Sequence, residues 1–158
     1  YVEALTGLRR GEICALELSD LDAQDMIHIT KDLVQDEKGN WVKKPPKTPG
    51  SVRNVLISHE LAEEIRKQGY VFKGFPGTIS TFLARTQKKL GLEHFSIHKL
   101  RHLFASILLD KGYDLKTIQE LGGWMGSETV SNIYLHSLKL KDEEKRKKIS
   151  SDISSFFD

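Results

Sequence analysis

The strand-like patterns of this sequence are confined to one short region, and this grouping constrains the fold more than any other feature. Residues 26–30 (MIHIT) have a β-like pattern, residues 36–40 (DEKGN) form a cluster of turn-type residues, and Trp41-Val42 resume the pattern. Prolines and a glycine interrupt residues 45–50, after which residues 52–57 are typical of a third strand. Because short turns join these segments, we expect a small three-stranded antiparallel sheet.

The remaining patterns are helical. Ser58, Thr78, Ser96 and Asp114 can each cap the start of a helix, and Gly122-Gly123 is typical of a helix end. A chain of 158 residues suits one hydrophobic core. The sequence predicts an α+β fold, a mostly α-helical single domain with the small three-stranded antiparallel sheet. Helices are expected over residues 10–18, 59–68, 78–90, 96–111, 114–121 and 127–134, followed by a charged tail over 139–157.

Composition and the start of the chain narrow the class of protein. Hydrophobic residues make up 39% and charged residues 29%, as in globular proteins. No apolar run approaches the roughly 20 residues that span a bilayer, so we expect a cytoplasmic protein without a membrane partner. The net charge of +2 permits nucleic-acid binding without demonstrating it. Because residues 2–5 lead directly into the Thr6-Gly7 turn, the chain reads as part of a longer protein.

The first segment that carries chemistry is Thr6-Gly7-Leu8-Arg9-Arg10-Gly11-Glu12. A tight glycine turn delivers two arginines beside a helix start, where a guanidinium can grip a phosphate through two parallel hydrogen bonds. Taken alone, the segment favours the simpler interpretation of a surface arginine pair that caps a turn.

The second segment is His98-Lys99-Leu100-Arg101-His102. On a helix, His98 and Arg101 lie on one face at positions i and i+3. Alone, such a pair is more often structural. His98 and His102 also have a spacing compatible with zinc, but no acidic or cysteine ligand lies at a suitable distance in the sequence, so we expect no metal.

The third segment is Leu121-Gly122-Gly123-Trp124, with Tyr134 ten positions after Trp124. Trp124 offers one N–H donor and Tyr134 a hydroxyl. A tryptophan and a tyrosine in a helical domain usually pack in the core, and this segment alone favours that interpretation.

Together, the three segments resemble the tyrosine recombinase family, the phage integrases and bacterial chromosome-dimer resolvases, over about residues 1–138. The shared pattern is Thr-Gly-x-Arg-x-x-Glu, His-x-x-Arg-His, and Leu-x-Gly-(His or Trp) with a tyrosine ten residues later. The resemblance implies that Arg9 and Arg101 are the catalytic arginines, His98 the first active-site histidine and Tyr134 the nucleophile. Trp124 stands where many members carry a second histidine.

The resemblance also implies a catalytic lysine in the turn between the second and third strands. Lys47, within Pro46-Lys47-Thr48-Pro49-Gly50, matches it, and Lys43 and Lys44 are competing candidates. Glu12 corresponds to the acidic residue that holds the first arginine, and His102 is a further supporting residue.

The chemistry implied is DNA cleavage and rejoining through a 3′-phosphotyrosine, without metal or cofactor. Arginines stabilise charge that develops on the non-bridging phosphate oxygens. A tyrosine hydroxyl, whose ordinary pKa is about 10, needs help to lose its proton, and His98 is the candidate base or proton relay. Lys47 is the candidate acid for the departing 5′ oxygen.

The resemblance further implies double-stranded DNA as partner and a homotetramer on DNA for the full-length protein. Residues 1–158 would be the catalytic domain, truncated at its N-terminus, with the family's core-binding domain absent. Residues 137–158 would form a tail helix that packs on a neighbouring protomer, and a helix folded back on its own domain is the open alternative.

Rival functions remain at this point. Residues 115–121, Gly122-Gly123 and residues 127–134 have the outline of a helix-turn-helix DNA-binding module, but such a module would not need the arginines and His98 as well. A type IB topoisomerase shares the chemistry, but the Leu-x-Gly-Trp spacing and the compact size favour a recombinase. A catalytically silent relative would only bind DNA, and the presence of all the expected active-site residue types argues against it. The DNA site, the host element and the outcome, whether integration, excision or dimer resolution, are not encoded in these motifs.

Overall fold

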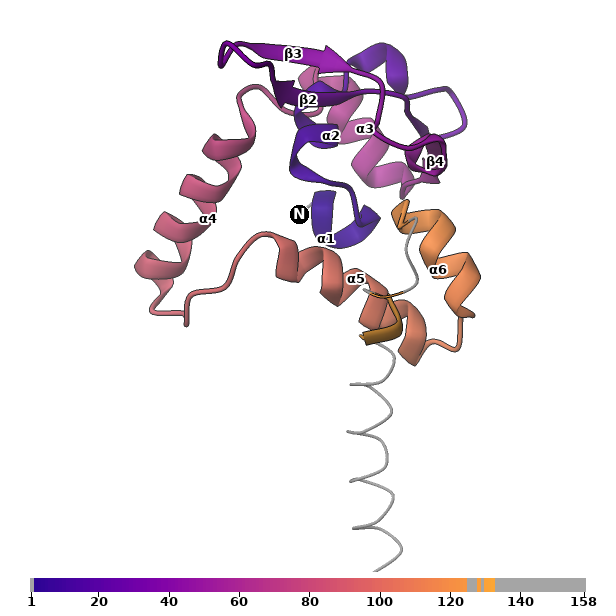
Figure 1. Cartoon of the computed structure of the whole chain (residues 1–158). Coiled ribbons are helices and arrows are strands. Elements are labelled where there is room, and N and C mark those ends of the chain that lie inside the picture. The colour runs from indigo at the N-terminus through magenta and orange to yellow at the C-terminus, as the bar shows by residue number, and fades with distance from the viewer. Residues whose placement is uncertain (1, 125–127, 129, 133–158) are drawn as a thin grey trace, which may run out of the picture.

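The computed structural model describes residues 2–124, 128 and 130–132 (Figure 1). Helices predominate and the strands form a small antiparallel part, so the predicted α+β class is confirmed. The described elements are, in order, helices α1 (Val2–Thr6) and α2 (Arg10–Ala15), the 3-10 turn η1 (Leu18–Asp20), strands β1 (Met26–Ile29), β2 (Asp32–Gln35) and β3 (Trp41–Lys44), the 3-10 turn η2 (Pro49–Ser51), strand β4 (Arg53–Leu56), and helices α3 (His59–Gln68), α4 (Pro76–Leu90), α5 (His98–Asp110) and α6 (Leu115–Gly122).

The strands differ from the expected single three-stranded sheet. β1 pairs with β4, and β2 pairs with β3, as two separate two-stranded antiparallel ladders. The strand at residues 32–35 was not predicted, because the charged pair Lys31-Asp32 obscures its short apolar centre. The carboxylate of Asp36 accepts hydrogen bonds from the backbone N–H groups of Lys38 and Asn40, at 2.9 and 2.8 Å, and so closes a local hairpin between β2 and β3.

Two of the four predicted helix caps act through their side chains. Ser58 accepts a hydrogen bond from the backbone N–H of Leu61, and Asp114 accepts one from that of Thr117. α4 begins two residues before Thr78 because Pro76 occupies its first turn, where the missing N–H costs nothing. α5 begins at His98, preceded by Ile97, which already has helical backbone angles and forms no side-chain cap.

The core that positions these elements has two parts. The larger lies between the β1–β4 ladder, α2 and α3, and the smaller joins α5 to α6. α1 packs against both α2 and α5, so it links the two parts, while α4 stands on the side of the molecule opposite α6 (Figure 1). The larger cluster comprises Leu8, Ile13, Leu16, Leu21, Ile27, Ile29, Val55, Ile57, Leu61, Ala62, Ile65 and Val71, and the smaller one Ala105, Ile118 and Val130.

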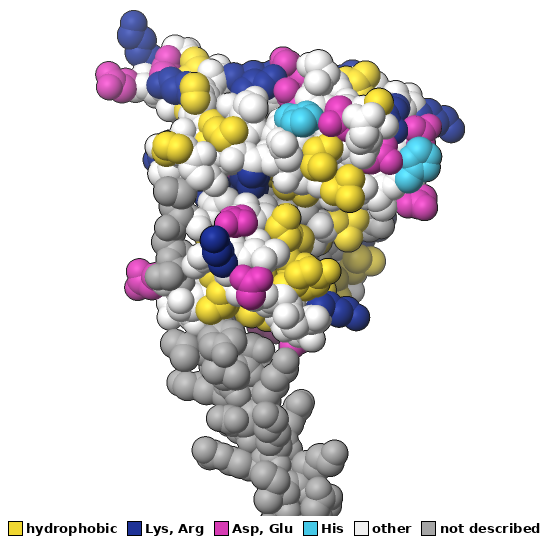
Figure 2. Space-filling model, turned by 90° about the vertical axis from the view of Figure 1, so that its right-hand side faces the viewer, with side chains coloured by type: hydrophobic (Ala, Val, Ile, Leu, Met, Phe, Trp, Pro, Cys, Tyr) yellow, Lys and Arg dark blue, Asp and Glu magenta, His cyan; other side chains and the backbone are white. Residues whose placement is uncertain are grey.

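Several predictions fall on residues that the structure does not describe. Tyr134 and the tail over 137–158 lie outside the described residues, as does part of the helix expected over 127–134. On the face seen in Figure 2, basic and acidic side chains are interspersed with hydrophobic ones. The basic side chains on that face therefore do not form one continuous patch.

Candidate active site

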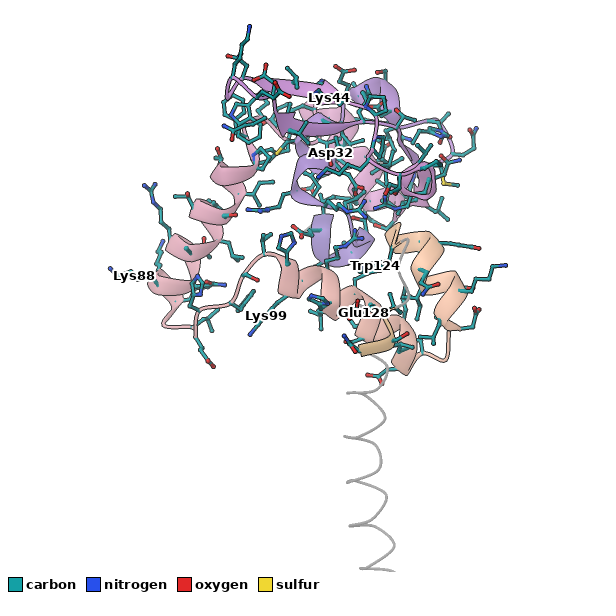
Figure 3. All side chains as sticks on the ribbon, in the orientation of Figure 1. Asp32, Lys44, Lys88, Lys99, Trp124 and Glu128 are labelled. Carbon is teal, nitrogen blue, oxygen red and sulfur yellow. The ribbon has the colours of Figure 1, made fainter. Side chains whose placement is uncertain are left out.

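Five of the predicted site residues line one pocket of about 310 Å³. They come from three places in the chain: the residue that caps the start of α2, the first turns of α5, and the second residue after α6. Figure 3 places Trp124 beside α5 and α6. The lining residues are Arg9, His98, Arg101, His102 and Trp124.

The turn between α1 and α2 brings the first arginine to this pocket. Gly7 has a φ of +65°, and a Cβ there would lie 2.6 Å from the ring of Phe104 on α5, so both the backbone angle and the close approach require glycine. The hydroxyl of Thr6 donates to the carbonyl of Val2 at 2.6 Å and accepts from the N–H of Leu8 at 3.3 Å. These contacts fix the turn against α5, and Arg9 follows directly.

Arg9 is held from three sides and still reaches solvent. Its Nη1 donates to Glu12 Oε1 at 2.6 Å and to Ser51 Oγ at 3.2 Å, and its Nη2 donates to the carbonyl of Gly123 at 2.6 Å. Glu12 also accepts from the backbone N–H of Arg9 at 2.7 Å. About a third of the Arg9 side chain (34%) is exposed, so the guanidinium can meet an anion that enters the pocket.

Arg101 is the buried cation of the pocket. It is 5% exposed and donates to the carbonyls of Gly7 and Gly122. Its guanidinium lies over the ring of Trp124, with the central carbon 4.1 Å from the ring centroid. Burial is the main cause that lowers the pKa of Arg101 to about 9, and the positive charge of Arg9 is the second. The Arg101 side chain is still charged at neutral pH.

His98 lies one helical turn from Arg101 on α5. Partial burial, followed by the positive charges of Arg10 and Arg101, lowers the pKa of His98. The neutral imidazole, which can accept a proton, is therefore favoured at neutral pH. Arg10 itself donates to Ser80 Oγ at 2.7 Å and so ties α2 to α4 beside this histidine.

The structure adds Arg53, which lies outside the three sequence motifs. Its Nη1 and Nη2 donate to Glu12 Oε1 and Oε2 at 3.0 and 2.9 Å, and both side chains are nearly or fully buried. Arg53 is in register with the inward-facing Val55 and Ile57, which follow it by two and four positions. An arginine in that register needs a buried carboxylate partner, and this was the available signal.

The three candidate lysines do not line the pocket: Lys43 and Lys44 lie on strand β3, and Lys47 follows it. Lys47 is exposed in the loop that precedes η2, and Lys43 donates to Glu17 Oε1 at 2.6 Å. Lys44 lies on β3 opposite Asp32, well separated from Trp124 in Figure 3. The structure thus groups Arg9, His98, Arg101, His102 and Trp124 around the pocket, but not Lys47, while Tyr134 is not described.

The described residues give no sign of a metal centre. Within 2–124, 128 and 130–132, three or more histidine, cysteine, aspartate or glutamate side chains do not gather in a way that would hold an ion. In the same part of the chain, every helix is too short or too polar to cross a bilayer.

Known proteins with similar sequences include recombinases and integrases. A tyrosine recombinase XerC of Corynebacterium glutamicum is 32% identical over 83% of this chain and 43% of its own length. The integrase of Staphylococcus phage L54a is 27% identical over 94% of this chain and 49% of its own length. The chain thus spans less than half the length of these relatives.

Solved structures share the fold. The Tn1549 transposon integrase in complex with a circular intermediate DNA superposes with a TM-score of 0.72 at 20% identity, over 90% of this chain and 56% of the other. The XerA recombinase gives a TM-score of 0.64 at 27% identity, over 92% and 56%. Residues 2–141 match the phage integrase family. The chain therefore belongs to the phage integrase family.

Proposed function

We propose that this chain is the catalytic domain of a tyrosine recombinase that cleaves and rejoins double-stranded DNA through a 3′-phosphotyrosine. The observation that carries the proposal is the convergence of two guanidinium groups, Arg9 and Arg101, with His98 and Trp124 around one pocket. Four hydrogen-bond donors or cations in one pocket suit a phosphodiester, whose non-bridging oxygens gain charge as the nucleophile attacks.

The two arginines have different parts in this mechanism. Arg9 is partly exposed and can bind a phosphate oxygen directly. Arg101 is buried under Trp124 and contributes a fixed charge in a site of low dielectric, where it acts more strongly than in water. Neither has to reorganise as the transition state forms, since backbone carbonyls already hold both guanidinium groups.

The proton transfers are assigned to His98, Lys47 and Tyr134. Tyr134 attacks the phosphorus, and the neutral His98 takes up or relays its proton. Lys47 protonates the departing 5′ oxygen from its exposed loop once DNA is bound. Trp124 donates its indole N–H to a phosphate oxygen but cannot transfer a proton. Glu12 and His102 support the arginines and His98.

The proposal extends to partners and place of action. The solved Tn1549 integrase is a DNA complex, which supports double-stranded DNA as the substrate. For the full-length protein we propose a homotetramer on DNA, with a core-binding domain before residues 1–158 and with residues 137–158 as a tail helix that packs on a neighbour. It would act in the cytoplasm, without a metal or nucleotide cofactor, in integration, excision or resolution reactions.

Covalent trapping tests the proposal. A duplex with a nick near the scissile phosphate loses its short 5′-hydroxyl strand after cleavage, so the protein–DNA adduct accumulates and migrates slowly on a denaturing gel. We expect an adduct with the intact protein and a loss on the order of 10²–10³-fold with Arg9→Ala. Arg66→Ala, a change in a half-buried ion pair with Asp25 whose residues do not line the pocket, is the control and should react normally. DNA binding without any adduct would favour the helix-turn-helix alternative.

A further inference from the structure

Three arginines hold the C-terminal end of α6 by three consecutive carbonyl groups. Arg53 Nε donates to the carbonyl of Leu121 at 2.8 Å, Arg101 Nη2 to that of Gly122 at 2.5 Å, and Arg9 Nη2 to that of Gly123 at 2.6 Å. A helix leaves its last carbonyls without partners, and its dipole makes this end negative. The three guanidinium groups donate hydrogen bonds to these carbonyls, and their positive charges offset the negative end of the dipole.

Arg53 differs from the other two because it does not line the pocket. Its side chain is 6% exposed, and each of its three nitrogens already donates to the protein. Besides Leu121, the acceptors are the carbonyl of Ser51 at 3.0 Å and both carboxylate oxygens of Glu12. Arg53 is thus placed to act through its neighbours and not on a phosphate.

Glu12 connects Arg53 to Arg9. Its Oε1 accepts from Arg9 Nη1 at 2.6 Å and from Arg53 Nη1 at 3.0 Å, and the whole side chain is buried. Ser51 is a second connection, because its hydroxyl accepts from Arg9 while its carbonyl accepts from Arg53. If Arg53 is removed, the Glu12 carboxylate loses two hydrogen bonds and can rotate, and the Arg9 guanidinium can move with it.

Arg53 also fixes the backbone that leads to Trp124. Leu121 precedes Trp124 by three residues, and Gly123 between them has a φ of +65°. A Cβ on Gly123 would lie 2.7 Å from Arg53 Nη1. The end of α6 and the Arg53 guanidinium therefore fit closely against each other.

From these contacts we propose that Arg53 is a positioning residue for DNA strand cleavage. It holds Arg9 through Glu12 and holds the end of α6 through Leu121, so that the groups that meet the scissile phosphate are in place before DNA binds. This inference rests on the proposed strand-cleavage function. A displacement of about 1 Å can lower a rate by on the order of 10²-fold, so Arg53→Lys should have an effect of that size.

The substrate can distinguish positioning from general damage to the fold. A methylphosphonate at the scissile position replaces one charged non-bridging oxygen with a methyl group, so cleavage depends less on correctly placed arginines. For the intact protein, Arg53→Lys should slow cleavage of the phosphodiester on the order of 10²-fold relative to wild type. With the methylphosphonate, the loss relative to wild type should shrink at least tenfold, in parallel with Arg9→Ala.

A second variant displaces Arg53 without altering it. Gly123→Ala places a methyl group against Arg53 Nη1, and should show the same dependence on substrate. The matched control is Gly91→Ala, which also follows a helix with a φ of +65° but whose added Cβ meets no atom within 4 Å in the described structure. Gly91→Ala should cleave both substrates as wild type does, so backbone strain alone would not explain the Gly123 result.

Each outcome decides the proposal. Equal losses on both substrates for Arg53→Lys and Gly123→Ala would show a merely structural role and overturn it, as would wild-type rates. If Arg53→Lys does not fold, Gly123→Ala decides in the same way. If wild type cleaves neither substrate, the proposed function fails and this inference with it; if wild type cleaves both, only the role of Arg53 is in question.

Discussion

Glu12 and Arg53 form a bidentate ion pair in which both carboxylate oxygens lie within 3.0 Å of guanidinium nitrogens. Glu12 is fully buried, and 6% of the Arg53 side chain is exposed. Burial opposes ionisation of Glu12, but the hydrogen bonds and charges of Arg53 and Arg9 outweigh it and lower the pKa of Glu12. The pair thus joins the α2 turn, strand β4 and the end of α6.

The first prediction is that Glu12→Gln destabilises the domain by about 3–5 kcal/mol, because it leaves Arg53 buried without a compensating charge. Urea unfolding at pH 7 measures this loss. The double variant Glu12→Gln/Arg53→Met should recover part of the lost unfolding free energy, because the buried Arg53 charge is removed as well. A single-variant loss below about 1 kcal/mol would contradict the buried ion pair.

The pH dependence of this contribution has a definite sign. Because the pKa of Glu12 is lower in the folded chain than its usual 4.5, the stabilisation is present above about pH 4.5 and is lost as pH falls through the folded pKa. The difference in unfolding free energy between wild type and Glu12→Gln should therefore narrow in acid. A difference that widens below pH 4 would contradict the lowered pKa.

The second prediction concerns Glu3, which is 3% exposed and lines an apolar cavity of about 300 Å³. Neither carboxylate oxygen has a hydrogen-bond partner among the described residues, and burial raises the pKa of Glu3 to about 7. A carboxyl with a raised pKa reduces stability as pH rises from about 4.5 to about 7.

Glu3→Gln removes this ionisation. The stability of the variant relative to wild type should rise by roughly 3 kcal/mol between pH 4.5 and pH 8. Thermal or urea unfolding at the two pH values measures the change, and any fixed cost of the amide cancels in the comparison. A relative stability that does not depend on pH would show that Glu3 ionises normally.

The third prediction concerns His98 and Arg10. Removing the positive charge in Arg10→Gln should raise the pKa of His98 toward its ordinary value, because imidazolium is then less repelled. If the neutral imidazole takes up the tyrosine proton, the cleavage rate falls in acid as His98 becomes protonated. In Arg10→Gln this fall should occur at higher pH. Rate profiles between pH 5 and 8 measure the shift, and Lys116→Gln, on the exposed face of α6, is the control. An unchanged acid limb would remove His98 from the role of base.

The fourth prediction tests Lys47 as the acid. Lys47→Ala should lower the cleavage rate roughly 10²–10⁴-fold with little effect on DNA binding. A substrate with sulfur in place of the bridging 5′ oxygen has a leaving group that needs no proton, so it should restore cleavage to Lys47→Ala but not to Arg9→Ala. Rescue of Lys43→Ala or Lys44→Ala instead would assign the role to that neighbour.

Local signals in the sequence account for much of the helical part of the fold. Ser58 and Asp114 act as caps because their side-chain oxygens reach a backbone N–H three residues on, an interaction within one turn. The pairing of β1 with β4 joins residues as far apart in the sequence as Met26 and Leu56, and alternation alone does not specify such a pairing. The sequence therefore predicted strands at 26–30, 41–42 and 52–57, but not their division into two ladders or the strand at 32–35.

In the candidate site too, local relationships could be predicted from the sequence and long-range ones could not. The spacing within His98-Lys99-Leu100-Arg101 places both functional side chains near one face of α5, since it spans one helical turn. The meeting of Arg9 with Gly123 joins residues more than 100 positions apart, and only the resemblance to a family suggested it. Arg53 lies outside the three motifs. Its register with Val55 and Ile57 indicates burial, but its partner Glu12 lies 41 positions away, so neighbouring residues do not identify the carboxylate that holds it.

Identification of the residue that becomes attached to DNA tests the central claim most directly. The intact protein is trapped on a nicked duplex, digested with protease, and the peptide that carries the nucleotide remnant is sequenced by mass spectrometry. The account predicts a phosphodiester link between Tyr134 and a 3′ phosphate, and no adduct with Tyr134→Phe, which should still bind the duplex. An adduct on another residue, or one that persists in Tyr134→Phe, would contradict it.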